Sequence, residues 1–180
     1  MANRQVRRST DGGFTLIELL IVVAIIGIIG AIAIPGLRRA WMSANEASAI
    51  GSLRAISSAQ TSYAAVAGRG GFAPGLGTLS AACPGGDSGF ISPDLSADPS
   101  KKSGYTVTLV PAAAAIAGPA DCNGVITQTA YYATAVPIAA SFSGQRAFGT
   151  TSGGSIFFDN LGVPPTEAQM AAGGSGTPLR

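Results

Sequence analysis

An uncharged stretch near the start of the chain limits what it can fold into. Residues 19–34 are sixteen consecutive residues without a charge, and a single carboxylate, Glu18, directly precedes them. As a helix, the 24 residues 14–37 would measure about 36 Å, enough to cross a hydrocarbon core of ~30 Å. A helix that is apolar on all sides is normally buried or in a membrane. The acid at its head needs a separate explanation.

The net charge of the chain comes from its first residues. Arg4, Arg7 and Arg8 against Asp11 account for the whole net charge of +2, because eight basic and eight acidic residues follow from position 14 onward. A basic stripe, as expected of a polyanion-binding surface, is missing. We therefore predict no nucleic-acid partner.

The sequence contains no histidine. This excludes Ser-His-Asp and Cys-His nucleophile pairs and histidine-containing zinc sites, so we predict neither an enzyme nor a cofactor. Asp87, Asp94, Asp98 and Asp121 flank loops but lack EF-hand spacing. Aspartates in Gly/Ser/Pro loops usually form turns, and a calcium site is the less favoured alternative.

Two ordinary interpretations of the apolar segment leave Glu18 unexplained. A secretory signal peptide would use the small-residue site Ala31-Ile-Ala33 and leave Ile34 as the first residue. Its apolar region would normally run about 7–15 residues, shorter than the uncharged run here. A plain transmembrane anchor fits the length, but it gives no reason for an acid at its head.

The stretch Gly12-Gly13-Phe14-Thr15-Leu16-Ile17-Glu18 closely resembles the signature of type IV prepilins. The resemblance implies that a membrane-embedded prepilin peptidase cuts between Gly13 and Phe14 on the cytoplasmic side and N-methylates Phe14. Glu18 as fifth and Pro35 as twenty-second residue of the processed chain match the type IVa pattern.

Cleavage would give Glu18 a partner. The new α-amine of Phe14, with a pKa near 8, would be positive at neutral pH, whereas an ionised carboxylate in hydrocarbon costs about 2.5–3.5 kcal/mol. A charge pair between neighbouring copies would penalise every axial offset except one. We therefore assign Glu18, with Thr15 of the same motif, to assembly and register. Glu18 complementing its own helix dipole, or contacting Phe14 of its own chain, are the alternatives.

Three residues weaken the apolar helix. Pro35 removes the hydrogen bond to the Ala31 carbonyl at a cost of about 3 kcal/mol, and Gly27 and Gly30 add to this. From the residues alone we expect a static kink. The resemblance implies in addition that residues 27–35 lose helicity in a filament.

The remaining chain predicts an α+β fold. Residues 37–66 lack proline and are expected to continue the helix to about fifty residues, near 80 Å, with a narrow apolar stripe. The stripe comprises Leu37, Trp41, Ala44, Ala47, Ile50, Leu53, Ile56, Tyr63 and Val66. Its second half should pack on an antiparallel sheet of roughly four strands, predicted at 105–110, 125–136, 146–151 and 155–159.

Side chains on these strands should cover the helix stripe. The expected residues are Val107, Leu109, Tyr131 or Tyr132, and Phe157 or Phe158. Residues 76–82 are predicted to form a short helical turn within the loop 72–104. Residues 163–180 are predicted to be a poorly ordered or draped tail.

Cys83 and Cys122 are the two cysteines of the chain. If the chain is exported, a disulfide is expected, and closing a loop of about forty residues would stabilise the fold by roughly 4 kcal/mol. Two free thiols are the alternative. In many pilins the bridge instead brackets the C-terminal region, so adhesive properties of that region are not transferred to this chain.

The resemblance yields an expected organisation and function. The regions are a cleaved leader at 1–13, an apolar membrane or filament-core helix at 14–37, an amphipathic helix at 38–67, a globular region at 68–162 and a C-terminal tail at 163–180. We expect a structural pilus subunit, single-pass in the bacterial inner membrane and then on the cell surface. Its partners would be further copies of itself, prepilin peptidase, and the assembly platform with its ATPase. A pseudopilin or minor pilin, and a secreted monomeric binding protein, are the alternatives.

Overall fold

The computed structural model describes residues 13–179; the leader arginines Arg4, Arg7 and Arg8 lie outside the described residues. The chain divides into two compact units, Met1–Arg38 and Arg39–Arg180. We call the second unit the head. One helix, α1 (Leu16–Val66), runs without interruption from the first unit into the second.

The two parts of α1 differ in burial. Every residue from 13 to 40 is exposed except the half-buried Gly30. The part of α1 in the head buries one face, made of Glu46, Ala49, Ser52, Leu53, Ile56, Ala59, Gln60 and Tyr63. The first part is thus apolar on all sides, and the second is one-sided, as predicted.

The predicted stripe was only partly correct. Leu53, Ile56 and Tyr63 are buried, but Trp41 is 62% exposed and Val66 77% exposed. The error arises because the buried face includes polar residues whose side chains find specific partners. Gln60, fully buried, donates to the carbonyl of Ala73 at 2.9 Å and accepts from its N–H at 2.8 Å.

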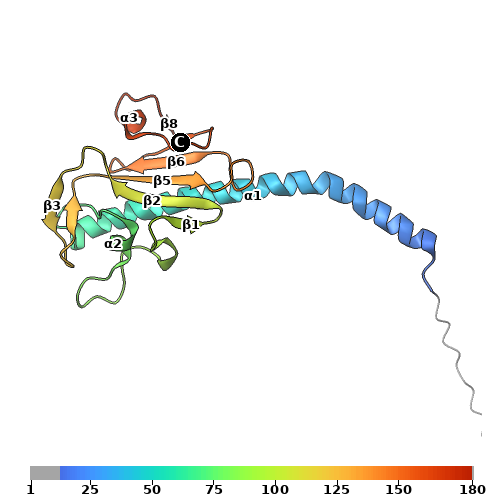
Figure 1. Ribbon diagram of the computed structural model, residues 1–180, viewed down its shortest axis with the longest axis horizontal. Coiled ribbons are helices and arrows are strands. Elements are labelled where there is room, and N and C mark those ends of the chain that lie inside the picture. The colour runs from blue at the N-terminus through green and yellow to red at the C-terminus, as the bar shows by residue number, and fades with distance from the viewer. Residues whose placement is uncertain (1–12, 180) are drawn as a thin grey trace, which may run out of the picture. The chain divides into compact units, whose positions relative to one another are not determined.

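The sheet of the head has more strands than the four predicted. Six antiparallel strands follow the spatial order β1-β2-β5-β6-β7-β8. They are β1 (Ser100–Lys102), β2 (Tyr105–Pro111), β5 (Tyr131–Pro137), β6 (Ala147–Thr151), β7 (Ile156–Asp159) and β8 (Thr177–Pro178). Figure 1 shows β2, β5 and β6 lying along the part of α1 that belongs to the head. The predicted combination of a long helix with an antiparallel sheet is confirmed.

The single strand predicted over 125–136 was wrong. It is two strands, because β4 (Ile126–Gln128) pairs with β3 (Ala117–Ala120) in a separate two-stranded sheet, and β5 begins at Tyr131. β4 also pairs with the segment that follows α1, since Phe72 forms an antiparallel bridge with Gln128. Residues 125–136 all favour β structure, so the sequence does not show that the pairing partner changes at residues 129–130.

The core lies between α1 and the sheet. Val107, Leu109 and Tyr131 are buried as predicted, and the Tyr131 hydroxyl lies 2.9 Å from that of Ser57 on α1. Phe157 and Phe158 are half-buried, and of the two Phe158 packs against the core. Phe148 on β6, which was not predicted, is fully buried.

The loop after α1 and the C-terminal tail contain short elements. The expected turn is present as α2 (Leu76–Ser80), followed by a 3₁₀ turn at Pro93–Leu95. The tail forms α3 (Glu167–Met170) and then β8 at the edge of the sheet. Met170 is buried, so the tail is draped on the head, which is one of the two predicted alternatives.

Candidate assembly segment

The first turn of α1 is organised by Thr15 and Glu18. Thr15 directly precedes the helix, and its hydroxyl accepts the Glu18 N–H at 3.3 Å and donates to the Glu18 carboxylate at 3.3 Å. The spacing Thr-x-x-Glu is that of a capping box. The sequence analysis assigned both residues to assembly but did not identify the capping-box spacing, which the sequence itself shows. In this chain the carboxylate is held at the helix start, where the dipole also favours it.

The bond between Gly13 and Phe14 lies just outside the helix. Gly13 and Phe14 are not helical, Phe14 is 77% exposed, and a Cβ added at Gly13 would meet no atom within 4 Å. An extended, uncovered backbone is the form in which a peptide bond is accessible to a peptidase. Residues 1–12 of the expected leader lie outside the described residues.

The segment after Glu18 exposes its apolar side chains in all directions. Leu19, Ile25 and Ile32, for example, are 59%, 52% and 77% exposed. By length and composition α1 qualifies as a helix able to cross a membrane. Side chains of this kind are stable only in a bilayer or against other apolar helices.

The helix-weakening residues lie within continuous helix. Pro35 is inside α1, which shows no break there. A Cβ at Gly27 would meet nothing within 4 Å, and one at Gly30 would meet only the Ile34 side chain at 3.9 Å. Packing within this chain therefore does not require glycine at either position.

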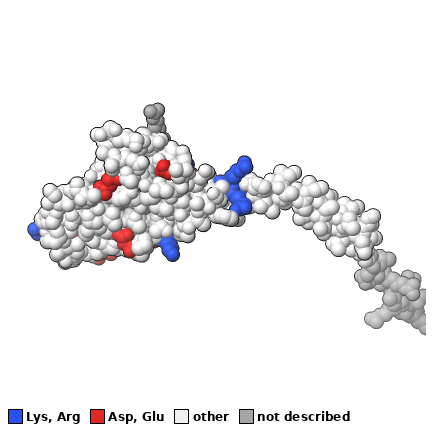
Figure 2. Space-filling view, turned by 45° about the horizontal axis from the view of Figure 1, so that its top comes forward, with Lys and Arg blue, Asp and Glu red and all other residues white. Residues whose placement is uncertain are grey.

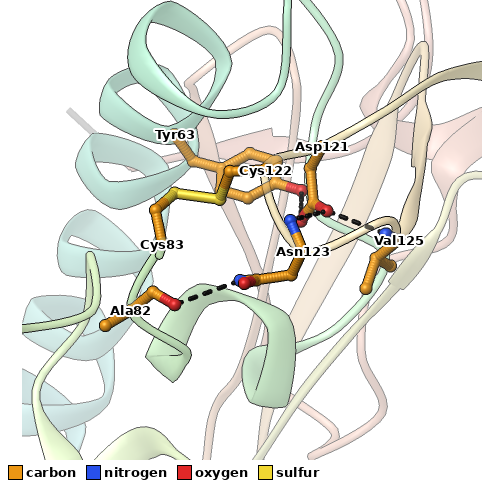
Figure 3. The surroundings of a disulfide bond; sticks show 7 residues. All are labelled: Tyr63, Ala82, Cys83, Asp121, Cys122, Asn123 and Val125. Atoms are coloured by element: carbon orange, nitrogen blue, oxygen red, sulfur yellow. Dashed lines mark hydrogen bonds between the residues drawn. A yellow bond between two sulfur atoms is a disulfide. The ribbon is translucent and has the colours of Figure 1, made fainter. Parts of the chain in front are cut away.

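The predicted disulfide is present in the head. Cys83 and Cys122 are bonded, with their Cα atoms 5.5 Å apart. The bridge joins the segment after α2 to the turn between β3 and β4, and Figure 3 shows it beside Tyr63 of α1. Asn123 adds a second link, since its side-chain amide donates to the Ala82 carbonyl at 3.2 Å. The long loop is thereby tied to the two-stranded sheet.

Asp121 organises the turn that carries Cys122. Its carboxylate accepts the Tyr63 hydroxyl at 2.7 Å and the N–H groups of Asn123 and Val125 at 2.8 Å each (Figure 3). Burial disfavours the charged form, but these hydrogen bonds outweigh it and lower the pKa of Asp121. Burial and the adjacent carboxylate raise the pKa of Tyr63. The pair therefore remains a hydroxyl donating to a carboxylate at neutral pH.

Glu46 fixes the other end of the head to α1. Its carboxylate accepts the N–H groups of Gln145 and Arg146 at 3.0 and 3.1 Å and forms an ion pair with the Arg146 guanidinium at 2.7 Å. Burial opposes ionisation, yet the two N–H groups and the guanidinium together lower the pKa of Glu46. The Arg146 guanidinium also lies over the rings of Phe148 and Phe158. A charged pair thus closes the sheet onto the helix.

The loop aspartates that were predicted to form turns have different partners and do not gather at one site. Asp98 accepts the Leu76 N–H at 3.1 Å, Asp94 pairs with Lys102 at 2.5 Å, and Asp121 holds its own turn. Over residues 13–179, no three His, Cys, Asp or Glu side chains group as a metal site would require. The remaining acid, Asp87, is exposed.

A comparison with protein families finds a match in this N-terminal segment. The model of the prokaryotic N-terminal methylation motif matches residues 8–34. This segment is similar to that of type IV pilins. Over 72 residues the chain is 46% identical to the type IV major pilin protein PilA of Myxococcus xanthus (strain DK1622), covering 36% of this chain and 33% of that protein. The pilin likeness thus extends over about a third of the relative's length. No solved structure matches the chain.

Proposed function

We propose that this chain is the structural subunit of a type IV pilus, polymerising through the apolar part of α1 after removal of its leader. The observation that carries the proposal is the exposure of residues 13–40 beside a head that buries its own core. Such a segment is complete only in a bilayer or among copies of itself. Head-to-tail packing of one helix against its neighbours makes an open, heterologous assembly and hence a fibre.

Processing is proposed at the exposed bond. Prepilin peptidase would cut between Gly13 and Phe14 and methylate the new amine of Phe14, which keeps its positive charge. The methylation motif over residues 8–34 and the non-helical, uncovered backbone at the site support this step. The subunit would wait in the inner membrane as a single-pass protein and then be taken up by an assembly platform with its ATPase.

Glu18 is proposed to set the register between copies. Within residues 13–179 its carboxylate accepts a hydrogen bond from the Thr15 hydroxyl at 3.3 Å, a local contact that brings no opposite charge. The methylated ammonium of a neighbour would neutralise it in a dry helix bundle, where an unpaired carboxylate is costly. Thr15 acts as a positioning residue, because its hydroxyl holds Glu18 at the helix start.

Mass spectrometry of the N-terminus tests processing, and two variants separate charge from capping. N-methyl-Phe14 is expected; Ile34 as the first residue would establish a cleaved signal peptide instead. Glu18→Gln keeps a side chain suited to the capping box but removes the charge, and should abolish filaments. Thr15→Ala removes the cap, at about 1 kcal/mol, and should only reduce their yield. Normal filaments from Glu18→Gln would refute the register hypothesis.

The protein composition of filaments sheared from the cell surface distinguishes a major pilin from the other kinds of subunit. If the chain is the main component of the purified fibre, it is a major pilin. Its presence as a trace component, or only in a periplasmic fibre, would assign it to the minor pilins or pseudopilins.

A further inference from the structure

Asn123 and Gly124 form an exposed pair in the turn between β3 and β4 of the head. Of the asparagines in the sequence, at positions 3, 45, 123 and 160, this one alone precedes a glycine. Asparagine is a thermally labile residue, because its side-chain amide can be attacked by the main-chain nitrogen of the next residue. Glycine hinders that nitrogen least, since it has no Cβ. The pair is therefore the most reactive of its kind in the chain.

The surroundings of the pair leave the reaction unobstructed. A Cβ built on Gly124 would meet no atom within 4 Å. Gly124 has a φ of 81°, in the left-handed region that favours glycine. The turn therefore requires a glycine after Asn123 and leaves both residues open to water. Figure 2 shows that charged side chains are few and scattered on the face of the head drawn there.

Two hydrogen bonds engage the reacting groups with other partners. The Asn123 side-chain amide donates to the Ala82 carbonyl at 3.2 Å, and Figure 3 shows it directed toward that carbonyl. The Gly124 N–H donates to the Asp121 carbonyl at 3.3 Å. Both bonds are longer than the 2.8 Å bonds that the Asp121 carboxylate accepts from the N–H groups of Asn123 and Val125. They are the weaker bonds of the turn, and both must break before the reacting groups can meet.

The disulfide closes directly beside the first of these bonds. Cys83 follows Ala82, the residue that supplies the accepting carbonyl, and it is bonded to Cys122. Cys122 in turn precedes Asn123. Ala82 and Asn123 are 41 residues apart in the chain, so without the disulfide a local opening of the loop would separate them. Formation of the disulfide therefore holds the side-chain amide of Asn123 away from reaction.

We propose that Asn123 deamidates in chains whose disulfide has not formed, and that the bonded turn keeps it intact. The Gly124 nitrogen attacks the side-chain carbonyl carbon of Asn123, and the new C–N bond closes a cyclic imide. The side-chain nitrogen leaves as ammonia, with the proton that the Gly124 nitrogen gives up. One water then opens the imide at either carbonyl and leaves an aspartyl or an isoaspartyl residue. The net change is one water consumed and one ammonia released.

Either product weakens the turn irreversibly. A carboxylate at position 123 has no N–H to donate to the Ala82 carbonyl, and it adds a like charge close to Asp121. The isoaspartyl product also lengthens the main chain between the two N–H groups that the Asp121 carboxylate binds. A disulfide that forms later would therefore close on an altered turn. The inference concerns the head alone and does not depend on the pilus assignment.

Mass spectrometry of the full chain in detergent tests this inference. The protein is kept at mildly alkaline pH in water labelled with heavy oxygen, so that each imide opened by water takes up label. The native chain is compared with the double variant Cys83→Ser and Cys122→Ser, whose fold is checked by near-UV circular dichroism. Asn160 is the internal control, because it is also exposed but precedes Leu161, whose N–H donates to the Asp159 carboxylate at 2.6 Å.

Residue 123 should take up label about fivefold faster in the double variant, the factor that corresponds to one hydrogen bond, while Asn160 stays slow in both chains. Equal rates at residue 123, or an equal rise at Asn160, would overturn the proposal. If the double variant does not fold, the native chain in urea decides, since it keeps the disulfide but loses the turn. Faster labelling of residue 123 in urea than in the folded chain supports protection by the turn, and an unchanged rate refutes it.

Discussion

Between Leu16 and Leu37, α1 exposes nearly all of its apolar side chains, whereas between Glu46 and Tyr63 it buries one face against the sheet. The exposed part carries one charged residue, Glu18, which bonds only to its own first turn. The buried part carries Glu46, which accepts three hydrogen bonds from Gln145 and Arg146, the two residues before β6. Glu46 thus has a charged partner within the head, whereas among the described residues the hydrogen bonds of Glu18 are with Thr15.

This contrast shows how one helix serves two separate purposes. Stability of the head depends on contacts within the chain, and its buried residues are specific, down to the paired hydrogen bonds of Gln60. Under the proposed function, assembly would depend on a segment whose apolar side chains fit many axial offsets equally well. Specificity would then rest on a few positions, such as Glu18. Substitutions in the two parts should therefore affect different measurements.

Removal of the disulfide should have the largest effect on the head. The bond closes a loop with a sequence separation of 39 residues. Replacing Cys83 and Cys122 with alanine should lower the free energy of unfolding by about 4 kcal/mol in the loop-entropy model. Denaturant unfolding of the full chain in detergent, followed by near-UV circular dichroism, measures this. Unfolding that is unchanged in the double variant would show that Asn123 and Asp121 suffice to hold the turn.

A matched pair of leucines tests the comparison directly. Leu53 is fully buried and Leu20 is 60% exposed. Leu53→Ala should destabilise the head by about 2–5 kcal/mol, whereas Leu20→Ala should change it by less than about 0.5 kcal/mol. Filament yield should respond to Leu20→Ala at unchanged head stability. Equal effects of both variants on unfolding would contradict the division of α1 into two parts.

The ion pair of Glu46 predicts a dependence on pH. Its folded pKa is lowered, so its contribution is fully present above the unfolded value near 4.3 and is lost as pH falls through the folded pKa. Asp121 acts in the same direction. Glu46→Gln should cost about 2 kcal/mol at neutral pH and should make the loss of stability below pH 4 less steep. If the free energy of unfolding of the variant fell with pH as that of the native chain does, Glu46 would not contribute to the pH dependence.

The sequence predicted the apolar segment, the long helix, the antiparallel sheet and the disulfide, because each follows from a local and unambiguous pattern. It failed where choice of partner decides the structure. The run 125–136 is β-prone throughout, and only pairing with Ala117–Ala120 divides it. The alanine- and serine-rich part of α1 left its buried face ambiguous, and Glu46 and Gln60 are polar residues that no hydrophobic pattern would place inside.

At the candidate site, the roles that the sequence assigned to individual residues stay predictions. The motif from Gly13 to Glu18 identified the segment, but the hydrogen bonds between Thr15 and Glu18 appeared only in the structure. Long-range contacts within the head, such as that of Asn45 with Ser143, 98 residues apart, were not predicted.

The smallest expected effects come from two glycines of α1. A Cβ at Gly27 or at Gly51 would meet no atom within 4 Å, so alanine fits either position in the single chain. Gly51 lies on the exposed side of the head helix, and Gly51→Ala should stabilise the head by up to about 1 kcal/mol, the difference in helix propensity. Gly27→Ala should leave head unfolding unchanged, because residue 27 belongs to the other unit.

The variants Gly27→Ala and Gly51→Ala should differ in filament yield. If residues 27–35 lose helicity on assembly, or if a neighbouring helix approaches closely at Gly27, the added methyl group opposes both, and Gly27→Ala should lower filament yield. Gly51→Ala should leave that yield unchanged. Electron microscopy of sheared filaments, counted per cell, measures the difference. Equal yields from both variants would mean that Gly27 contributes to neither process, and that the apolar part of α1 keeps in the fibre the helix it has in the single chain.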